Sequence, residues 1–164
     1  MVIHDKPSQE MGDRGESNFV AACLAKGWVK PEKSNSYQDR LQHWDYKMSN
    51  GARVDVKAAK KKNRSDTNPD YSLIYVEFKG ITGHAGWIYG KADLIAFERE
   101  FDFILIPRLL VVKLAETLVS SEFSRRPELY KSYRRRNRPD ERVGLITIED
   151  MLQVKHSKLM KVIV

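Results

Sequence analysis

The stretch HWDYKMSNGARVDVK, residues 43–57, decides the fold, because it has the pattern of two short strands joined by a tight turn. A three-residue loop over Ser49–Gly51 keeps the apolar side chains of both strands on one face, whereas a two-residue loop mixes the faces. Gly51 suits the left-handed backbone that such a loop needs. The pairs that this register predicts are Tyr46 with Val54 and Trp44 with Val56.

The opposite face of this hairpin carries two aspartates. The register sets Asp45 directly opposite Asp55, with Cβ atoms roughly 4.5–5.5 Å apart. Two like charges at that separation repel each other, and a divalent cation between them reverses the sign of the interaction. Lys57, which the register sets opposite His43, can then orient or activate a water molecule or neutralise charge on a phosphate. The alternative is an exposed polar face on which the acids pair with neighbouring cations: Lys47, Arg53 and Lys57.

A third acid, Glu16, lies in DRGESNFVAACLAK, residues 13–26, whose spacing predicts a helix that ends at Gly27. Glu16 stands at helical intervals before the apolar side of this helix, so we expect its carboxylate to point towards the sheet. There it needs a partner such as a metal ion or a water molecule. The alternative, compatible role is a capping box with Asp13 as N-cap. The residues expected on the inward side are Phe19, Val20, Cys23 and Leu24.

The remaining chain predicts an α/β (α+β) protein in which a mixed central β-sheet is flanked by helices. Residues 1–12 are expected as a flexible arm and residues 30–40 as a loop. Residues 109–119 fit a helix or a strand, and Thr147 is expected to cap a short helix over 148–154. Strands are expected near 42–48, 53–59, 72–79, 92–98, 101–107, 143–147 and 158–164.

The order of these residues resembles the core of the PD-(D/E)xK nuclease superfamily, in which a helix is followed by a strand with an aspartate and then by a strand with an acid-x-lysine motif. The matching residues are Glu16, Asp45 and Asp55-Val56-Lys57. Two positions depart from that pattern, because Trp44 stands where the superfamily has proline and Asp55 is its less frequent acid.

Two longer stretches carry the same resemblance, which extends over about residues 12–106. Residues 12–28, GDRGESNFVAACLAKGW, are similar to the opening helix of archaeal Holliday-junction resolvases. Residues 86–98, GWIYGKADLIAFE, are similar to segments of small phage endonucleases. The resemblance implies a single domain over residues 1–164 with a restriction-endonuclease-like core, and it makes a phage origin an expectation.

The resemblance also implies a chemistry, since the acids of that superfamily bind Mg²⁺, with Mn²⁺ able to substitute, and its lysine assists the attacking water. The implied function is a Mg²⁺-dependent endonuclease that hydrolyses DNA, with junction or branched DNA as a candidate substrate. The alternatives are a nucleic-acid-binding protein that cannot cut and a ribonuclease. A homodimer is expected where both strands are cut. The implied roles are catalysis by Glu16, Asp45, Asp55 and Lys57, and metal ligation by Asp45, Asp55, the backbone carbonyl of Val56 and Glu16.

A second acid-x-lysine motif, Glu77-Phe78-Lys79, leaves another site open. In that alternative Asp55 is the first acid, and Glu77 and Lys79 complete the site. We favour the hairpin residues, because the turn brings them together whatever the loop at 60–71 does. In that case three further residues either surround the site, contact the substrate or lie on the surface without a role in the site: Glu77, Lys79 and His43.

The chain has a net charge of +7 at pH 7, which favours an anionic partner such as DNA, with RNA not excluded. Basic residues concentrate just after the hairpin and in the segment 121–142, of which the part 125–142 has eight lysines or arginines against three acids. Tyrosines within this segment can stack on unpaired bases. The alternative is a solvated, mobile basic loop. The residues expected to bind nucleic acid are Lys60, Lys61, Lys62, Arg64, Tyr133, Arg134, Arg135, Arg136 and Arg138.

The chain has the composition expected of a cytoplasmic protein. Its one cysteine, Cys23, excludes an internal disulfide and fits a reducing compartment. No apolar run approaches the ~18 residues that a membrane span needs, and the N-terminal stretch lacks the apolar centre of a signal peptide. We therefore expect the cytoplasm, which is that of the host if the protein is phage-encoded, and no membrane partner.

Overall fold

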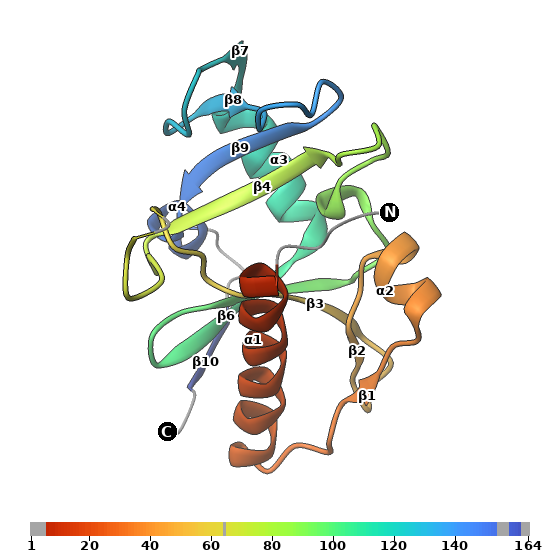
Figure 1. The fold of residues 1–164 in the computed structure, drawn as a ribbon. Coiled ribbons are helices and arrows are strands. Elements are labelled where there is room, and N and C mark those ends of the chain that lie inside the picture. The colour runs from red at the N-terminus through yellow and green to blue at the C-terminus, as the bar shows by residue number, and fades with distance from the viewer. Residues whose placement is uncertain (1–5, 64, 154–157, 162–164) are drawn as a thin grey trace.

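The computed structural model describes residues 6–63, 65–153 and 158–161, which form helices and two β-sheets (Figure 1). This architecture confirms the expected mixed α and β class, in which mixed sheets are flanked by helices. The helices are α1 (Lys6–Ala25), α2 (Ser36–Gln42), the 3-10 helix η1 (Trp87–Tyr89), α3 (Arg108–Leu118) and α4 (Ile148–Leu152).

The central sheet has six strands in the order β1-β2-β3-β5-β6-β10. Strands β3 and β5 run parallel, and the other neighbouring pairs are antiparallel. The parallel pair sets Asp55 beside Ile95, so the aspartate lies inside the sheet and not at its edge. The strands are β1 (Glu32–Lys33), β2 (Tyr46–Lys47), β3 (Arg53–Lys57), β5 (Leu94–Glu98), β6 (Asp102–Pro107) and β10 (Lys158–Lys161).

A second sheet has four strands in the order β4-β9-β8-β7, and it takes β4 out of the central sheet. Strand β4 pairs antiparallel with β9, while β7 and β8 run parallel. Along β4 buried and partly exposed side chains alternate, so one face of the second sheet joins the core. The strands are β4 (Leu73–Lys79), β7 (Ser120–Phe123), β8 (Lys131–Tyr133) and β9 (Arg142–Thr147).

Two clusters of buried side chains lie against the central sheet. Helix α1 lies across one face (Figure 1) and packs Phe19, Ala22 and Cys23 against β2, β3, β5 and β6. The second cluster joins the central sheet to α3 and to the second sheet, and Ile95 and Phe97 of β5 belong to it. Because both faces of β5 are covered, its sequence reads as an almost continuous apolar run.

Helix α1 is longer at its start than the sequence predicted. It begins at Lys6, so residues 6–12, expected as part of a flexible arm, are helical; residues 1–5 lie outside the described part of the chain. Asp13 consequently lies within the helix, and the expected capping box with Asp13 as N-cap is wrong. The expected end is confirmed, because Gly27 follows the helix with a left-handed φ of 75°. Leu24, expected to face inward, is 49% exposed.

The chain between α1 and the hairpin is also more ordered than expected. The predicted loop over 30–40 contains β1 and most of α2, which begins with a capping box between Asn35 and Gln38. Because α2 reaches Gln42 and His43 adopts a left-handed φ of 55°, the expected strand over 42–48 shrinks to the two residues of β2.

The hairpin turn itself forms as predicted. Tyr46 pairs with Val54, and Gly51 has a φ of 86°. The expected pairing of Trp44 with Val56 is wrong, because the left-handed residue before Trp44 turns its ring into the cluster shared with α3 and the second sheet, whereas Val56 faces α1.

The later elements follow the sequence more closely. The ambiguous segment 109–119 is helix α3, and Thr147 caps α4 through a capping box with Asp150. Strands β5, β6 and β9 lie where they were expected; residues 154–157 and 162–164, parts of the predicted last helix and strand, lie outside the described residues. Among the described helices, none is both long and apolar enough to cross a bilayer.

Candidate active site

Side chains from two strands fix the centre of the site. Asp45, just before β2, is 5% exposed, and Asp55, in the middle of β3, is 2% exposed. The ladder ends at Tyr46 and Val54, so Asp45 is not paired with Asp55 as a ladder residue. Instead Oδ2 of Asp45 accepts a hydrogen bond of 2.7 Å from the backbone N–H of Val56, which holds its carboxylate beside β3.

The environment of Asp55 disfavours its charged form. Burial raises the pKa of Asp55 well above its usual range; the positive charge of Lys57 opposes this shift, and the negative charge of Asp45 adds to it. The two carboxyl groups therefore interact closely, as the sequence predicted.

One oxygen of Asp55 is left without a partner. Oδ1 lies 2.9 Å from Nζ of Lys57, but Oδ2 is buried and accepts no hydrogen bond from any described residue. A buried carboxylate oxygen without a partner is costly, and native proteins rarely leave one. A cation at this oxygen would remove that cost.

Lys57 is held as a cation. Its Nζ lies 2.9 Å from Asp55 and 4.8 Å from the centre of the Trp87 ring. Burial lowers the pKa of Lys57, but the charges of Asp55 and Asp45 outweigh burial and the net shift is upward. A protonated amine cannot take a proton from water, so Lys57 acts here as a hydrogen-bond donor and a positive charge.

Glu16 reaches the same site from α1. Its Oε2 lies 2.7 Å from Nζ of Lys33, and this ammonium lies 3.9 Å from Oδ1 of Asp45. Burial raises the pKa of Glu16, Lys33 lowers it and Asp45 raises it. The structure therefore brings Glu16, Asp45, Asp55 and Lys57 together, as the sequence predicted.

Two residues of the site were missed. Lys33 lies on β1, where it pairs with Tyr46, and Asp39 lies on α2. Burial raises the pKa of Asp39, and the charge of Asp45 raises it further, which places these two carboxyls near each other. Both belong to the segment 30–40 that was expected as a loop. The signal that could have found α2 is the spacing of Asn35 and Gln38, which is typical of a capping box.

The donor chemistry of the centre fits a hard divalent cation. Two buried carboxylates, one with an unpartnered oxygen, are ligands of the kind that Mg²⁺ prefers. As the side chains stand, no three acidic, histidine or cysteine residues in the described chain are grouped as a metal site. Two ammonium groups, those of Lys33 and Lys57, lie against the carboxylates of Glu16 and Asp55.

The second acid-x-lysine motif lies on a different sheet from Asp55. Glu77 and Lys79 belong to β4, and a β-bulge separates them. Lys79 is exposed. The charge of Glu77 nevertheless raises the pKa of Lys57, so Glu77 lies near the hairpin site.

His43 lies beside the same centre. Burial lowers the pKa of His43, and the positive charge of Lys57 lowers it further. Gly90 lies close to this side chain, because a Cβ at Gly90 would lie 2.7 Å from the Cβ of His43. The imidazole is thus held in its neutral form near Lys57.

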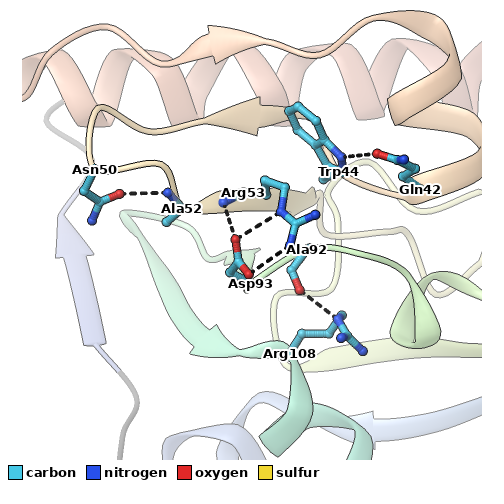
Figure 2. A network of polar contacts seen from close by, with 8 residues as sticks. All are labelled: Gln42, Trp44, Asn50, Ala52, Arg53, Ala92, Asp93 and Arg108. Atoms are coloured by element: carbon cyan, nitrogen blue, oxygen red, sulfur yellow. Dashed lines mark hydrogen bonds and ion pairs between the residues drawn. The ribbon is translucent and has the colours of Figure 1, made fainter.

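A network of hydrogen bonds fixes the hairpin from outside (Figure 2). Asp93, just before β5, accepts from the backbone N–H of Arg53 at 2.8 Å and from its guanidinium Nε at 3.2 Å. In the turn, Asn50 accepts from the N–H of Ala52 at 3.0 Å. These contacts tie the start of β3 to the loop before β5 and so set the position of Asp55.

Some of the basic residues expected to bind nucleic acid lie near other charges of the protein, and others are exposed. Desolvation lowers the pKa of Lys60, and the nearby charges of Lys57 and Arg135 lower it further. Lys61, Lys62 and Arg136 are exposed, and Arg138 and Tyr133 are half-buried. Arg64 lies outside the described residues.

Two arginines of the loop after β8 are engaged within the protein. Glu141 is fully buried and accepts hydrogen bonds of 3.0 Å from the backbone N–H and from Nε of Arg135. Arg134 stacks on Phe123, with 4.0 Å between the guanidinium carbon and the ring centre. Arg135 is thus an anchor of the loop, and the exposed Arg136 is better placed for an external anion.

Comparison of the chain with protein-family models, with characterised proteins and with solved structures gives no match in any of the three.

Proposed function

We propose that this protein is a Mg²⁺-dependent endonuclease that hydrolyses phosphodiester bonds in DNA. The observation that carries the proposal is the buried Oδ2 of Asp55, which has no partner in the described chain although Asp45 and Lys57 lie beside it. Two carboxylates that repel each other in a buried site, next to a fixed ammonium, form an arrangement that a divalent cation would complete.

The order of the elements supports the same proposal. The helix with Glu16, the strand after Asp45 and the strand with Asp55 and Lys57 come in this order along the chain, with β1 and α2 between the helix and the first of these strands. Strand β3 then pairs in parallel with β5. This is the sequence of elements on which the resemblance to the PD-(D/E)xK superfamily rests, so we assign a restriction-endonuclease-like core to the central sheet and α1.

The proposed reaction adds water across a phosphorus–oxygen bond. A Mg²⁺ ion held by Asp45 and Asp55, with the Val56 carbonyl as a further ligand, would supply a bound water of lowered pKa and positive charge at the phosphate. The water oxygen bonds to phosphorus as the bond to the leaving sugar oxygen breaks. The water loses its proton to solvent, and the leaving oxygen gains one.

Other residues of the site have roles beside that of the metal ion. Lys57 donates a hydrogen bond to the attacking water or to a phosphate oxygen on which charge develops, and Asp55 fixes the direction of its ammonium. Glu16 positions water at the edge of the site, with Lys33 as its partner. Glu77 borders the site and raises the pKa of Lys57, and His43 lies near Lys57, whose charge lowers the pKa of the imidazole.

The surface around the site suits a polyanion. Lys60 lies near Lys57, and its neighbours Lys61 and Lys62 are exposed. The loop after β8, which Glu141 anchors through Arg135, carries the exposed Arg136. We assign DNA, branched DNA included, as the substrate on this basis, with a phage origin, a homodimer and the cytoplasm as parts of the same proposal.

The test is cleavage of end-labelled linear, nicked, flapped and four-way DNAs and matched RNAs, with Mg²⁺, Mn²⁺ or EDTA. We expect the wild-type protein to cut DNA only with a metal ion and Asp55→Asn to be inactive. Glu100→Gln, an exposed acid in the turn after β5, serves as the control and should cut normally. Salt-sensitive binding without any cutting would overturn the proposal in favour of a non-catalytic protein, and cutting of RNA alone would make the enzyme a ribonuclease.

A further inference from the structure

The acidic cluster is asymmetric in how its charges are neutralised. At one end, Nζ of Lys33 lies 2.7 Å from Glu16 Oε2 and 3.9 Å from Asp45 Oδ1. At the other end, Oδ2 of Asp55 is buried and unpartnered among the described residues. Lys57 lies 2.9 Å from the other oxygen of Asp55, so both ends hold an ammonium, but the Asp55 end still has a buried carboxylate oxygen without a partner among the described residues.

The position of Lys33 is set by the fold and is not that of a loose surface side chain. Strand β1 pairs antiparallel with β2 and places Lys33 beside Tyr46, and the ammonium lies 4.9 Å from the centre of the Tyr46 ring. Three contacts from α1, the segment before β2 and β2 itself thus fix this ammonium.

The place that Lys33 occupies matters because two-metal phosphodiesterases hold their ions roughly 3.5–4 Å apart, bridged by a shared carboxylate. Asp45 is the carboxylate that could be shared here. The ammonium of Lys33 lies 3.9 Å from its Oδ1, and Asp55 on β3 is close enough for the two carboxyl groups to interact. A second divalent ion between Glu16 and Asp45 would have to displace an ammonium that already binds both acids.

We propose that Lys33 takes the place of a second metal ion, so that the site holds a single divalent cation, at Asp45 and Asp55. This inference rests on the proposed function and goes further, because it assigns Glu16 to Lys33 and not to a metal. Lys33 is a positioning residue: it supplies one fixed positive charge beside Asp45 and binds the Glu16 carboxylate, which therefore does not bind the single ion.

The test counts bound ions and does not depend on cleavage. Equilibrium dialysis with Mn²⁺ is carried out on the full chain of the wild type, Lys33→Met, Lys33→Arg and the control Lys47→Met, which removes an exposed lysine from the neighbouring strand β2. We expect one ion per chain in the wild type, Lys33→Arg and Lys47→Met. We expect two in Lys33→Met, because the freed Glu16 and Asp45 oxygens then accept a second ion. Lys33→Gln repeats the measurement with a polar side chain in case Lys33→Met does not fold.

Two results would overturn the inference and leave the proposed function in place: two ions in the wild type, or one ion in both Lys33→Met and Lys33→Gln. A wild type that binds no ion, with the same result in Asp55→Asn, would overturn the proposed metal site and this inference together. The number of bound ions therefore separates a failure of this inference alone from a failure of the proposed metal site.

Discussion

At the scale of single residues, the proposed cation site depends on how Asp55 is buried. Its carboxylate has one oxygen on Lys57 and one with no partner in the described chain. Breaking a buried ion pair by removing one member costs about 3–5 kcal/mol of stability, because the remaining charge loses its partner. The charges of Lys33 and Lys57 and of the proposed cation together balance those of the carboxylates.

Replacing Lys57 tests that balance. In Lys57→Met we expect cleavage to fall by about 10²–10³-fold, since a donor to the developing phosphate charge is lost. The ammonium also leaves Oδ1 of Asp55, so the variant should gain more stability from Mg²⁺ than the wild type does. Single-turnover cleavage and thermal unfolding measure the two effects, with Lys47→Met as control. Wild-type cleavage in Lys57→Met would remove this residue from the chemistry.

The buried thiol of Cys23 gives a pH dependence of stability. Burial raises the pKa of the Cys23 thiol to about 11, against 9.0 for an ordinary thiol. Between these values the unfolded chain ionises while the folded one does not, so the free energy of unfolding falls as pH rises, by an amount on the order of 2 kcal/mol. Urea unfolding from pH 8 to 11 should show a steeper decline in the wild type than in Cys23→Ala. Equal slopes would place the thiol in a solvated site.

At the scale of elements, the site exists because α1 lies very close to the strand that carries Asp55. A Cβ at Gly15 would lie 2.7 Å from the Cβ of Ala58, just beyond β3, whereas a Cβ at Gly12 meets nothing within 4 Å. The absence of a side chain at Gly15 therefore sets the distance from α1, and from Glu16, to the sheet.

The two glycines of α1 form a matched pair for a test. Gly15→Ala should destabilise the protein by about 1–3 kcal/mol, because the helix must move away from β3. Gly12→Ala should stabilise it by roughly 0.5–1 kcal/mol, because alanine is the better helix former and has free space. Denaturant unfolding of both variants measures the difference. A stabilised Gly15→Ala would show that α1 can shift without cost.

The basic loop after β8 depends on Glu141 for its conformation. We expect Glu141→Ala to weaken DNA binding, although it makes the protein more basic, because Arg135 loses the hydrogen bonds that hold the loop. Asp140→Ala removes the same charge from an exposed neighbour and should bind DNA as tightly as the wild type or more tightly. Fluorescence anisotropy at several salt concentrations compares them. Tighter binding by Glu141→Ala would mean that charge alone determines affinity.

At the scale of the whole molecule, the sequence was most informative where one physical pattern dominates. Short apolar runs located β5, β6 and β9, and the need to keep Tyr46 and Val54 on one face set the hairpin register. The cluster of Glu16, Asp45, Asp55 and Lys57 followed from that register and from helical spacing.

The parts that could not be predicted depend on contacts between distant segments. The alternation in β4 fits an edge of either sheet, so only its pairing with β9 shows that it leaves the central sheet. Helix α2 is too short for its periodicity to be informative, and it is held by its cap and by the turn at His43. Asp39 was missed for this reason, and Lys33 was missed because β1 has only two residues.

The most direct test of the central claim is the free energy of unfolding of the metal-free protein, measured with and without Mg²⁺ at pH 7. We expect Mg²⁺ to stabilise the wild type, by about 2.7 kcal/mol when its concentration is a hundred times the dissociation constant. Asp55→Asn should gain nothing from Mg²⁺, because it lacks the carboxylate that is proposed to bind the ion. If Mg²⁺ stabilised neither protein, or both equally, the paired aspartates would not be a cation site.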